Sequence, residues 1–256
     1  MMAIYIPRCK NTPEPELSFT LDQGGIVRGD TTKNNISLIF TGGAYNDGGN
    51  YIRDLLKNRR IKASFFFTGN FYRNRENSVL IKNLLDDGHY LGPHSDSHPL
   101  YCAWENRDSL LITKEEFLND IADNYETMNK FGIAKKDANI FMPPYEWYNG
   151  SISQWSGEYG LILVNYSPGT LSNADYTTPN MSNYRASSEI LQSIVEYEKS
   201  NPGGLNGFFL LLHVGTHPDR KDKFYFLLDE LIEYLNRENY RFVKINEIIR
   251  SESIRK

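Results

Sequence analysis

The stretch "ISLIF", residues 36–40, is a short apolar run that predicts a strand buried on both faces. Helical spacing of apolar residues follows over residues 50–60. The alternation repeats with the apolar run "KASFFFTG" at 62–69 and a helical pattern at 78–88 that ends on a glycine. Buried strands that alternate with helices are typical of βα units in a parallel sheet.

The same alternation continues to the end of the chain. Strands are predicted at 90–95, 139–142, 161–167, 207–215 and 240–245, and helices at 113–132, 187–201 and 223–239. Six or seven βα units favour a closed or nearly closed barrel over an open sheet, although the pattern does not separate the two. In a parallel barrel the functional site lies at the carboxyl ends of the strands.

The N-terminal part of the chain has a different character. Residues 1–35 are polar and rich in Pro and Gly, with one alternating stretch, "LSFTLDQGGIVRGD", at residues 17–30. This stretch predicts a hairpin or apron at the periphery of the molecule. We therefore expect a peripheral segment over residues 1–35 and one barrel domain over residues 36–256, an α/β fold.

Composition excludes some classes of function. The net charge is −4 and no basic run occurs, which argues against a nucleic-acid partner. No window approaches 18 apolar residues, so no membrane span is expected. The apolar part of residues 1–18 is too short for a secretory signal. Cys9 and Cys102 lie far apart in the sequence and make no disulfide framework.

Aromatic residues are abundant, with 17 Tyr and 14 Phe. They fit either a β-rich core or a cleft that binds carbohydrate, where a ring offers an apolar face and a hydroxyl.

Histidines are concentrated in the stretch "GHYLGPHSDSHP", residues 88–99. It carries His94 and His98, two of the five histidines of the chain, four residues apart. Neutral imidazoles are good ligands for zinc and similar metals, and this spacing suits a shared ion on a helical turn or in a loop. The alternative is that both merely cap a loop. His213 closes the strand "GFFLLLHVG" and is either a pocket wall or a satisfied core histidine.

Five blocks of the sequence together resemble a known family. "KASFFFTG", "GHYLGPHSDSHP", "FMPPY", "LLLH" and "YRFVKI" occur in the order and spacing of the NodB-type polysaccharide deacetylases, carbohydrate esterase family four. The resemblance runs from about Ile36 to the C-terminus. It implies a distorted (β/α) barrel that removes N- or O-acetyl groups from sugars with a divalent metal, which we expect to be zinc.

The resemblance also assigns roles to residues. It implies that His94 and His98 bind the metal and that the backbone N–H of Tyr145 helps to hold the oxyanion. It further implies that Leu211 shapes the acetyl pocket and that His213 is the general acid.

Three departures from the family pattern bear on catalysis. Where the family has an Asp base followed by an Asp metal ligand, this chain has Thr41 and Gly42, and neither carries a carboxylate. Met142 stands where the family has the Arg that pairs with the base. The absence of both the Asp base and its Arg partner is consistent, because an Arg without its carboxylate would be an unpaired buried charge. The Asp-rich fourth block of the family is not recognisable in "VNYSPGTLSNADY".

Other acids are candidates to replace the missing pair. Asp47, in a glycine-rich loop, is the candidate third metal ligand, with Asp96 or water as alternatives; Asp47 could instead cap the helix near Asn50. Glu146 follows Tyr145 directly and is the candidate general base, or else a surface residue that binds sugar hydroxyls.

A further set of residues is predicted to contact the substrate. Four aromatic residues are candidates to stack on sugar rings, and a proline lies beside the oxyanion residue: Trp104, Trp147, Tyr148 and Trp155, with Pro144.

The leading prediction is a metal-dependent hydrolase that removes acetyl groups from an amino-sugar polysaccharide or oligosaccharide. The runner-up is a catalytically inactive relative that binds carbohydrate, and a third reading is an amidohydrolase or esterase of a small molecule. Because such polysaccharides lie outside the cytoplasm, we expect an extracytoplasmic location.

Overall fold

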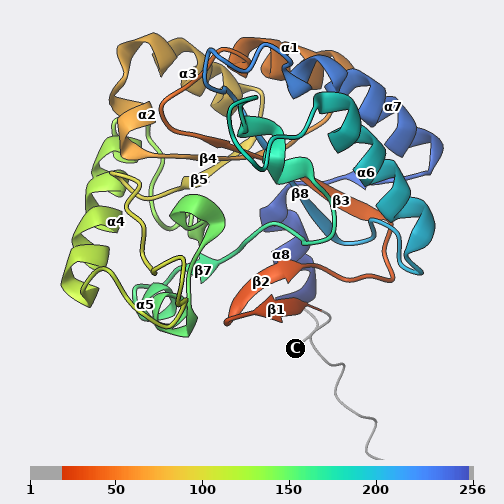
Figure 1. Cartoon of the computed structure of the whole chain (residues 1–256). Helices are drawn as coiled ribbons and strands as arrows, with labels where there is room; N and C mark the ends of the chain where they lie inside the picture. Colours follow the sequence, from red (N-terminus) through yellow and green to blue (C-terminus); the bar gives the residue numbers. More distant parts are fainter. Residues whose placement is uncertain (1–18, 254–256) are drawn as a thin grey trace, which may run out of the picture.

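The centre of the molecule is a curled, mainly parallel β-sheet wrapped by helices (Figure 1). This computed structural model describes residues 19–253. The strands are β1 (Thr20–Asp22), β2 (Gly25–Arg28), β3 (Asn35–Gly42), β4 (Ser64–Phe67), β5 (Tyr90–Pro93), β6 (Ile140–Phe141), β7 (Ile162–Leu163), β8 (Phe208–His213) and β9 (Arg241–Phe242).

The strand order shows how the sheet closes. The main sheet runs β1-β2-β8-β3-β4-β5, with β9 beside the start of β3, and β6 and β7 form a separate parallel pair. Two links join the pair to the main sheet. Met142 N–H donates to Pro93 O (3.2 Å) beside β5, and Ile26 bridges to Val164 beside β2. The sheet is therefore an incompletely hydrogen-bonded, distorted (β/α) barrel, and the predicted fold class is confirmed.

Eight α-helices are present in the described part of the chain: α1 (Gly49–Arg59), α2 (Gly69–Arg73), α3 (Ser78–Asp86), α4 (Lys114–Asn129), α5 (Gly150–Glu158), α6 (Ser187–Ser200), α7 (Leu228–Arg237) and α8 (Ile245–Ser253). Helix α4 begins with the predicted capping box, in which Thr113 Oγ1 accepts from Glu116 N–H and Glu116 Oε2 accepts from Thr113 N–H. Helices α2, α5 and α8 were not predicted. Asn149 Oδ1 caps α5 by accepting from the N–H groups of Ser151 and Ile152.

Phenylalanines fill much of the hydrophobic core. Phe40 of β3 stacks on Phe65 of β4, with ring centroids 5.1 Å apart, and Phe67 stacks on Phe71 at 4.1 Å. All four are fully buried, and each buried ring contributes about 1.5–3 kcal/mol of hydrophobic stabilisation. The phenylalanines of β3 and β4 therefore belong to the core and not to a cleft that binds carbohydrate.

The N-terminal hairpin is attached to the barrel. Strands β1 and β2 pair antiparallel, and β2 pairs with β8 through Arg28 and Phe208. The Arg28 guanidinium donates to the carbonyls of Gly204 (2.7 Å) and Asn206 (2.8 Å). The first 18 residues of the predicted peripheral segment, Cys9 included, lie outside the described residues. Cys102 is buried as a free thiol.

Within residues 19–253, no helix is long and apolar enough to cross a membrane.

Candidate active site

The polar residues singled out from the sequence gather where parallel strands end. His94 follows β5 directly, Tyr145 and Glu146 lie in a 3-10 turn (Pro144–Glu146) that follows β6, and His213 is the last residue of β8. Because the carboxyl ends of parallel strands share one end of a barrel, these side chains meet at its mouth.

His94 presents one ring nitrogen to the mouth of the barrel. Its Nδ1 lies 2.9 Å from the carbonyl oxygen of Met142. A carbonyl only accepts, so Nδ1 carries the proton and Nε2 keeps its lone pair. The ring of His98 lies 5.0 Å from that of His94 between centroids. Burial holds the pKa of His94 well below its ordinary value and lowers that of His98 to about 4, so both rings are neutral near pH 7.

A tight loop, rather than a helical turn, brings the two histidines together. Ser95 and His98 have left-handed backbone angles (φ 66° and 61°), and Ser95 Oγ accepts from His98 N–H at 3.0 Å. The Asp120 carboxylate of α4 accepts from the N–H groups of Asp96 and Ser97, both at 2.9 Å. These bonds fix the loop and therefore the spacing of the rings.

Glu146 faces His94 across a short gap. Its side chain is 13% exposed, and Oε1 lies 4.0 Å from His94 Nε2. Burial raises the pKa of Glu146 to about 7. Tyr145 and Glu146 are both left-handed (φ 58° and 53°), a conformation that costs about 1–2 kcal/mol for each non-glycine residue. Asn165 Nδ2 donates to Glu146 O (2.8 Å) and holds this strained turn in place.

His213 forms a charge pair with a residue that the sequence analysis missed. Its Nδ1 lies 2.6 Å from Oδ1 of Asp175, and its backbone N–H donates to Oδ2 at 2.9 Å. Burial alone would lower the pKa of His213, but the charge and hydrogen bond of Asp175 raise it above the ordinary value. Asp175 lies within "SNADY" and is the single acid between Glu158 and Glu189, a signal that would have singled it out.

The end of β3 carries no titratable group. Thr41 is aligned with His213 of β8, and its Oγ1 is buried with no hydrogen-bond partner among the described residues. A Cβ atom built on Gly42 would lie 2.7 Å from Val214 Cγ2 and 2.8 Å from Phe67 Cδ1. Apolar side chains therefore fill the space beside Gly42 that a carboxylate would need. Met142 is also fully buried.

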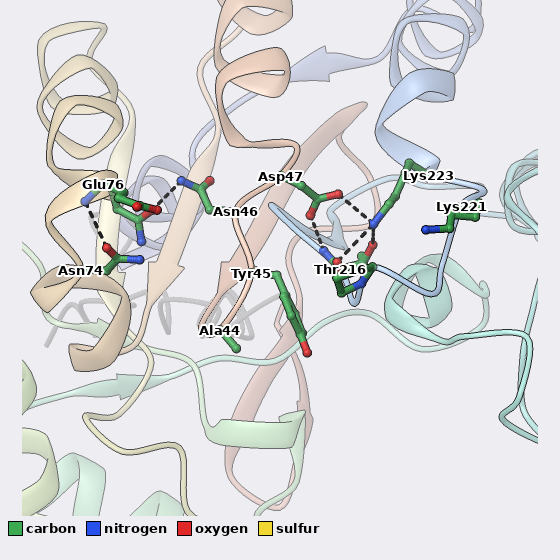
Figure 2. Close-up of a pocket in the computed structure, with 11 residues that line it drawn as sticks. Ala44, Tyr45, Asn46, Asp47, Asn74, Glu76, Thr216, Lys221 and Lys223 are labelled. Carbon is green, nitrogen blue, oxygen red and sulfur yellow. Dashed lines mark hydrogen bonds and ion pairs between the residues drawn. The ribbon is translucent and has the colours of Figure 1, made fainter.

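Asp47 does not join the histidines. Its carboxylate accepts from Thr216 N–H (2.8 Å) and Tyr225 Oη (3.1 Å) and pairs with Lys223 Nζ (2.8 Å), in a separate cleft (Figure 2). The structure therefore does not bring Asp47 together with the histidines, because the glycine-rich loop turns away from the mouth. Asp47 does not cap α1 either, since Gly48 is the N-cap residue and no side chain bonds there.

Asp96 is also engaged elsewhere, in a bidentate pair with Arg73 at 2.7 and 2.8 Å.

Part of the predicted aromatic surface is exposed beside His98. The Tyr145 ring lies 4.4 Å from that of His98, and Trp104 lies 5.8 Å from Tyr145 and stacks on Trp147 at 5.6 Å. Trp104 is 55% exposed and Tyr145 46%. We call these three residues, Trp104, Tyr145 and Trp147, the aromatic platform.

The other predicted substrate contacts are inside the protein. Tyr148 is fully buried and its hydroxyl donates to Asp22 O (2.8 Å), so the expectation that its ring stacks on sugar is wrong. Trp155 packs against Phe117 of the core and does not belong to the platform. Pro144 is buried in the turn, and Leu211 is buried within β8.

The donors at the mouth suit a divalent cation in their chemistry. His94 Nε2 and the His98 ring are neutral nitrogen donors, and Glu146 adds an oxygen 4.0 Å from Nε2. Among residues 19–253, however, no group of three or more His, Cys, Asp or Glu side chains is arranged to hold a metal ion. His94 and His98 are thus the residues suited to hold the ion, and its third protein ligand is not preformed.

Comparison with known proteins places this site in a family. The family model described as polysaccharide deacetylase matches residues 28–164. A peptidoglycan-N-acetylglucosamine deacetylase of Bacillus cereus is 28% identical over 199 residues, which cover 78% of this chain and 80% of the relative.

Solved structures share the fold. The Bc1960 peptidoglycan N-acetylglucosamine deacetylase superposes with a TM-score of 0.69 at 21% identity, covering 87% of this chain and 91% of that one. BA3943, described as a family four pseudoenzyme from Bacillus anthracis, superposes with a TM-score of 0.66 at 18% identity, covering 89% of this chain and 69% of that one. These matches confirm the resemblance seen in the sequence blocks. The chain belongs to the polysaccharide deacetylase family, the NodB-type hydrolases of carbohydrate esterase family four.

Proposed function

We propose that this protein hydrolyses acetyl groups from an amino-sugar polysaccharide or oligosaccharide. The observation that carries the proposal is the buried His213–Asp175 pair, which lies at the same barrel mouth as His94, His98 and Glu146. Relatives named peptidoglycan-N-acetylglucosamine deacetylase and chitin deacetylase support this substrate class.

His213 is the proposed general acid. Asp175 accepts at Nδ1, which fixes the ring and leaves Nε2 to carry the proton that the leaving amine needs. The negative charge of Asp175 favours the protonated ring, so His213 is charged over a wider pH range than a free histidine. A group held in this way donates its proton as the carbon–nitrogen bond breaks.

Glu146 is the proposed general base, in place of the carboxylate absent at Thr41. It is the acid that faces His94, and its pKa of about 7 suits a group that must accept a proton near neutral pH. Water attacks the acetyl carbon while Glu146 takes its proton. The presence of Glu at a left-handed position that favours glycine supports a role for the side chain.

Two further features complete the proposed site. The Tyr145 N–H lies in the first turn of a 3-10 helix, where amides lack intrahelical partners, and it is the proposed donor to the oxyanion. His94 and His98 are the proposed metal ligands. A bound divalent ion, which we propose to be zinc, would lower the pKa of water and polarise the acetyl carbonyl. Collapse of the tetrahedral species yields acetate and a free amine.

The second candidate function is carbohydrate binding without turnover. It is favoured by the filled space beside Gly42 and by the absence of a carboxylate at the end of β3. A structural neighbour is described as a pseudoenzyme, and a mutant of it as having restored enzymatic activity. In this case the aromatic platform would hold a glycan and no acetate would be released.

Acetate release from acetylated chito-oligosaccharides separates the two functions. The protein is stripped with chelator and assayed with and without added zinc, alongside Glu146→Gln and a control, Glu126→Gln, on the exposed face of α4. We expect release by the parent and by the control, and a loss of about 10²–10⁴-fold in Glu146→Gln. No release by folded parent protein, with or without added zinc, would leave the binding function.

The site of action follows from the substrate. Peptidoglycan and similar polymers lie outside the cytoplasm, so we propose extracytoplasmic action. Detection of the protein in fractionated cells, beside a cytoplasmic marker, tests this.

A further inference from the structure

Arg220 is a fully buried residue that the proposed reaction does not use. It lies in the loop after β8, seven residues beyond His213. Among residues 19–253, the one carboxylate oxygen within ion-pair distance is Asp222 Oδ2, 3.9 Å from Nη2 of Arg220. Taking a guanidinium out of water costs several kcal/mol, so a buried Arg without a close carboxylate needs other contacts to compensate.

Acceptors on a neighbouring segment of the chain provide these contacts. Nη1 of Arg220 donates to the carbonyl oxygens of Thr177 (2.6 Å) and Arg185 (3.1 Å), and Nη2 donates to Ser187 Oγ (3.1 Å). A guanidinium holds its donors in a rigid planar fork, so it can bind several acceptors at once in a fixed geometry. Arg220 therefore fastens residues 177–187 to the loop after β8.

The segment that connects β7 to α6, residues 164–186, carries Asp175 and has little regular structure (Figure 1). Its helical part is the 3-10 turn Ser172–Tyr176. Before this turn, Ser167 N–H donates to the carbonyl of Phe209 in β8 at 3.0 Å. A segment of this kind has few backbone bonds of its own, so its position depends on ties to the rest of the protein.

Thr177 links Arg220 to the turn that carries Asp175. The N–H and the hydroxyl of Thr177 both donate to Ala174 O, at 3.0 and 2.6 Å, and close the turn. The carbonyl of Thr177 accepts from Arg220. Asp175 lies between Ala174 and Thr177, so the bond to Arg220 restrains the carboxylate that holds His213.

The charge of Arg220 does not account for its place near the site. Burial and the positive charge of Arg220 both lower the pKa of His213, and the charges of Asp175 and Glu146, with the Asp175 hydrogen bond, more than offset them. A general acid must carry a proton, so the charge of Arg220 by itself opposes the proposed role of His213. Any benefit from Arg220 therefore comes from the geometry that it imposes.

We propose that Arg220 is a positioning residue of the active site, which keeps Asp175 within hydrogen-bond distance of His213 by holding the carbonyl of Thr177. The inference rests on the proposed function, in which His213 is the general acid. It adds a residue that touches neither the substrate nor the reacting atoms. Without the Arg220 bonds the turn can move, and His213 loses both the orientation of its ring and the charge that favours its protonated form.

Titration of His213 by NMR tests the proposal without substrate. The imidazole resonances of 15N-labelled, metal-free protein are followed from pH 5 to pH 9 in the parent, Arg220→Met and Arg220→Lys. We expect the pKa of His213 to fall in both variants, and the resonance of the Nδ1 proton bound to Asp175 to weaken. Removal of a positive charge without movement of Asp175 would instead raise this pKa in Arg220→Met. An unchanged or raised pKa of His213 in folded Arg220→Met overturns the proposal.

Arg28→Lys is the matched control. Arg28 also donates to backbone carbonyls, those of Gly204 and Asn206, but in the loop before β8 at the opposite end of the barrel. We expect this variant to leave the titration of His213 unchanged, and a fall equal to that in Arg220→Lys overturns the proposal. Four other titratable residues interact electrostatically with His213 and are kept in every variant: Asp175, Glu146, His94 and His98.

A milder variant decides the matter if neither Arg220 variant folds. Ser187→Ala removes the acceptor of Nη2, and we expect a smaller fall in the pKa of His213. An unchanged titration in Ser187→Ala then overturns the proposal.

Acetate release provides a separate readout. We expect kcat/KM of Arg220→Lys to be about 10–10²-fold below that of the parent, with the alkaline limb of the pH profile shifted to lower pH. A parent-like pH profile in Arg220→Lys contradicts the positioning role. A parent that releases no acetate refutes the hydrolase function, whereas the titration of His213 still decides the role of Arg220.

Discussion

Strands β3 and β8 lie side by side and end at the same mouth, yet their ends differ in chemistry. Strand β8 ends in His213, which is paired with Asp175, and the charge of Asp175 favours the protonated ring. Strand β3 ends in Thr41 and Gly42, with no titratable group and with apolar neighbours in the space beside Gly42. The group that we propose as the proton donor therefore lies on β8, whereas the proposed proton acceptor, Glu146, comes from the turn after β6 and not from β3.

The largest effect is expected on the β8 side. Changing His213 to Ala removes the proposed acid and should lower kcat/KM for acetate release by about 10²–10⁴-fold. Asp175→Asn should give a smaller loss and shift the alkaline limb of the pH profile to lower pH, because it removes the charge that raises the pKa of His213, the group that must be protonated. Steady-state kinetics between pH 5 and 9 checks both. Undiminished activity in His213→Ala would contradict the proposed role of His213 as the general acid.

Placing an acidic residue at the end of β3 should destabilise the fold. Gly42→Asp places a Cβ atom 2.7–2.8 Å from Val214 and Phe67 and buries a charge there, so we expect a loss of at least about 3 kcal/mol in the free energy of unfolding. Urea denaturation measures it. The double variant Gly42→Asp with Val214→Ala should recover part of the loss. A Gly42→Asp protein as stable as the parent would show that the end of β3 has room for a carboxylate.

The buried carboxylate of Glu146, the proposed base, should make the stability of the protein depend on pH. The folded state raises the pKa of Glu146 from 4.5 to about 7, so it binds a proton more tightly than the unfolded chain does between these values. Stability from this group is therefore full below pH 4.5 and falls as the pH rises through 7, by about 3 kcal/mol in total. In metal-free protein Glu146→Gln should remove this decline. Urea denaturation of both proteins at pH 5 and pH 8 measures the free energy of unfolding. If this free energy changed equally with pH in both proteins, burial would not raise the pKa of Glu146.

The smallest effect is expected at Thr41. Its buried hydroxyl has no partner among the described residues, so Thr41→Val should change the free energy of unfolding by less than about 1 kcal/mol and leave kcat within about threefold. Thermal unfolding and acetate release provide the two readouts. A large loss of activity in a stable Thr41→Val protein would reveal a bond that forms only with substrate.

The sequence predicted the barrel well because hydrophobic periodicity is local. The runs that became β3, β4 and β8 are short, apolar and bounded by polar loops, and their ends locate the mouth. Helix α5 was missed because its apolar residues have only a weak helical period. Helix α8 was missed although its apolar residues have a clear helical period. The candidate metal ligands and the candidate general acid were assigned from family motifs, and these motifs lie at strand ends.

Loop geometry limited the prediction of the site. Asp47 lies in a glycine-rich loop whose path depends on Gly215 and Lys223, far away in the sequence. Tyr148 looked like its neighbours in the loop, but its hydroxyl finds Asp22 O inside the protein. Asp175 was recoverable, because no other acid occurs nearby in the sequence. Long-range pairing, rather than local pattern, therefore decided the cases of Asp47 and Tyr148.

The close packing of Val214 and Phe67 around Gly42 also sets which residues the end of β3 can accept. Any side chain at this position meets Val214 and Phe67 first. An engineered carboxylate at the end of β3 would therefore require a smaller residue at position 214 or 67 as well.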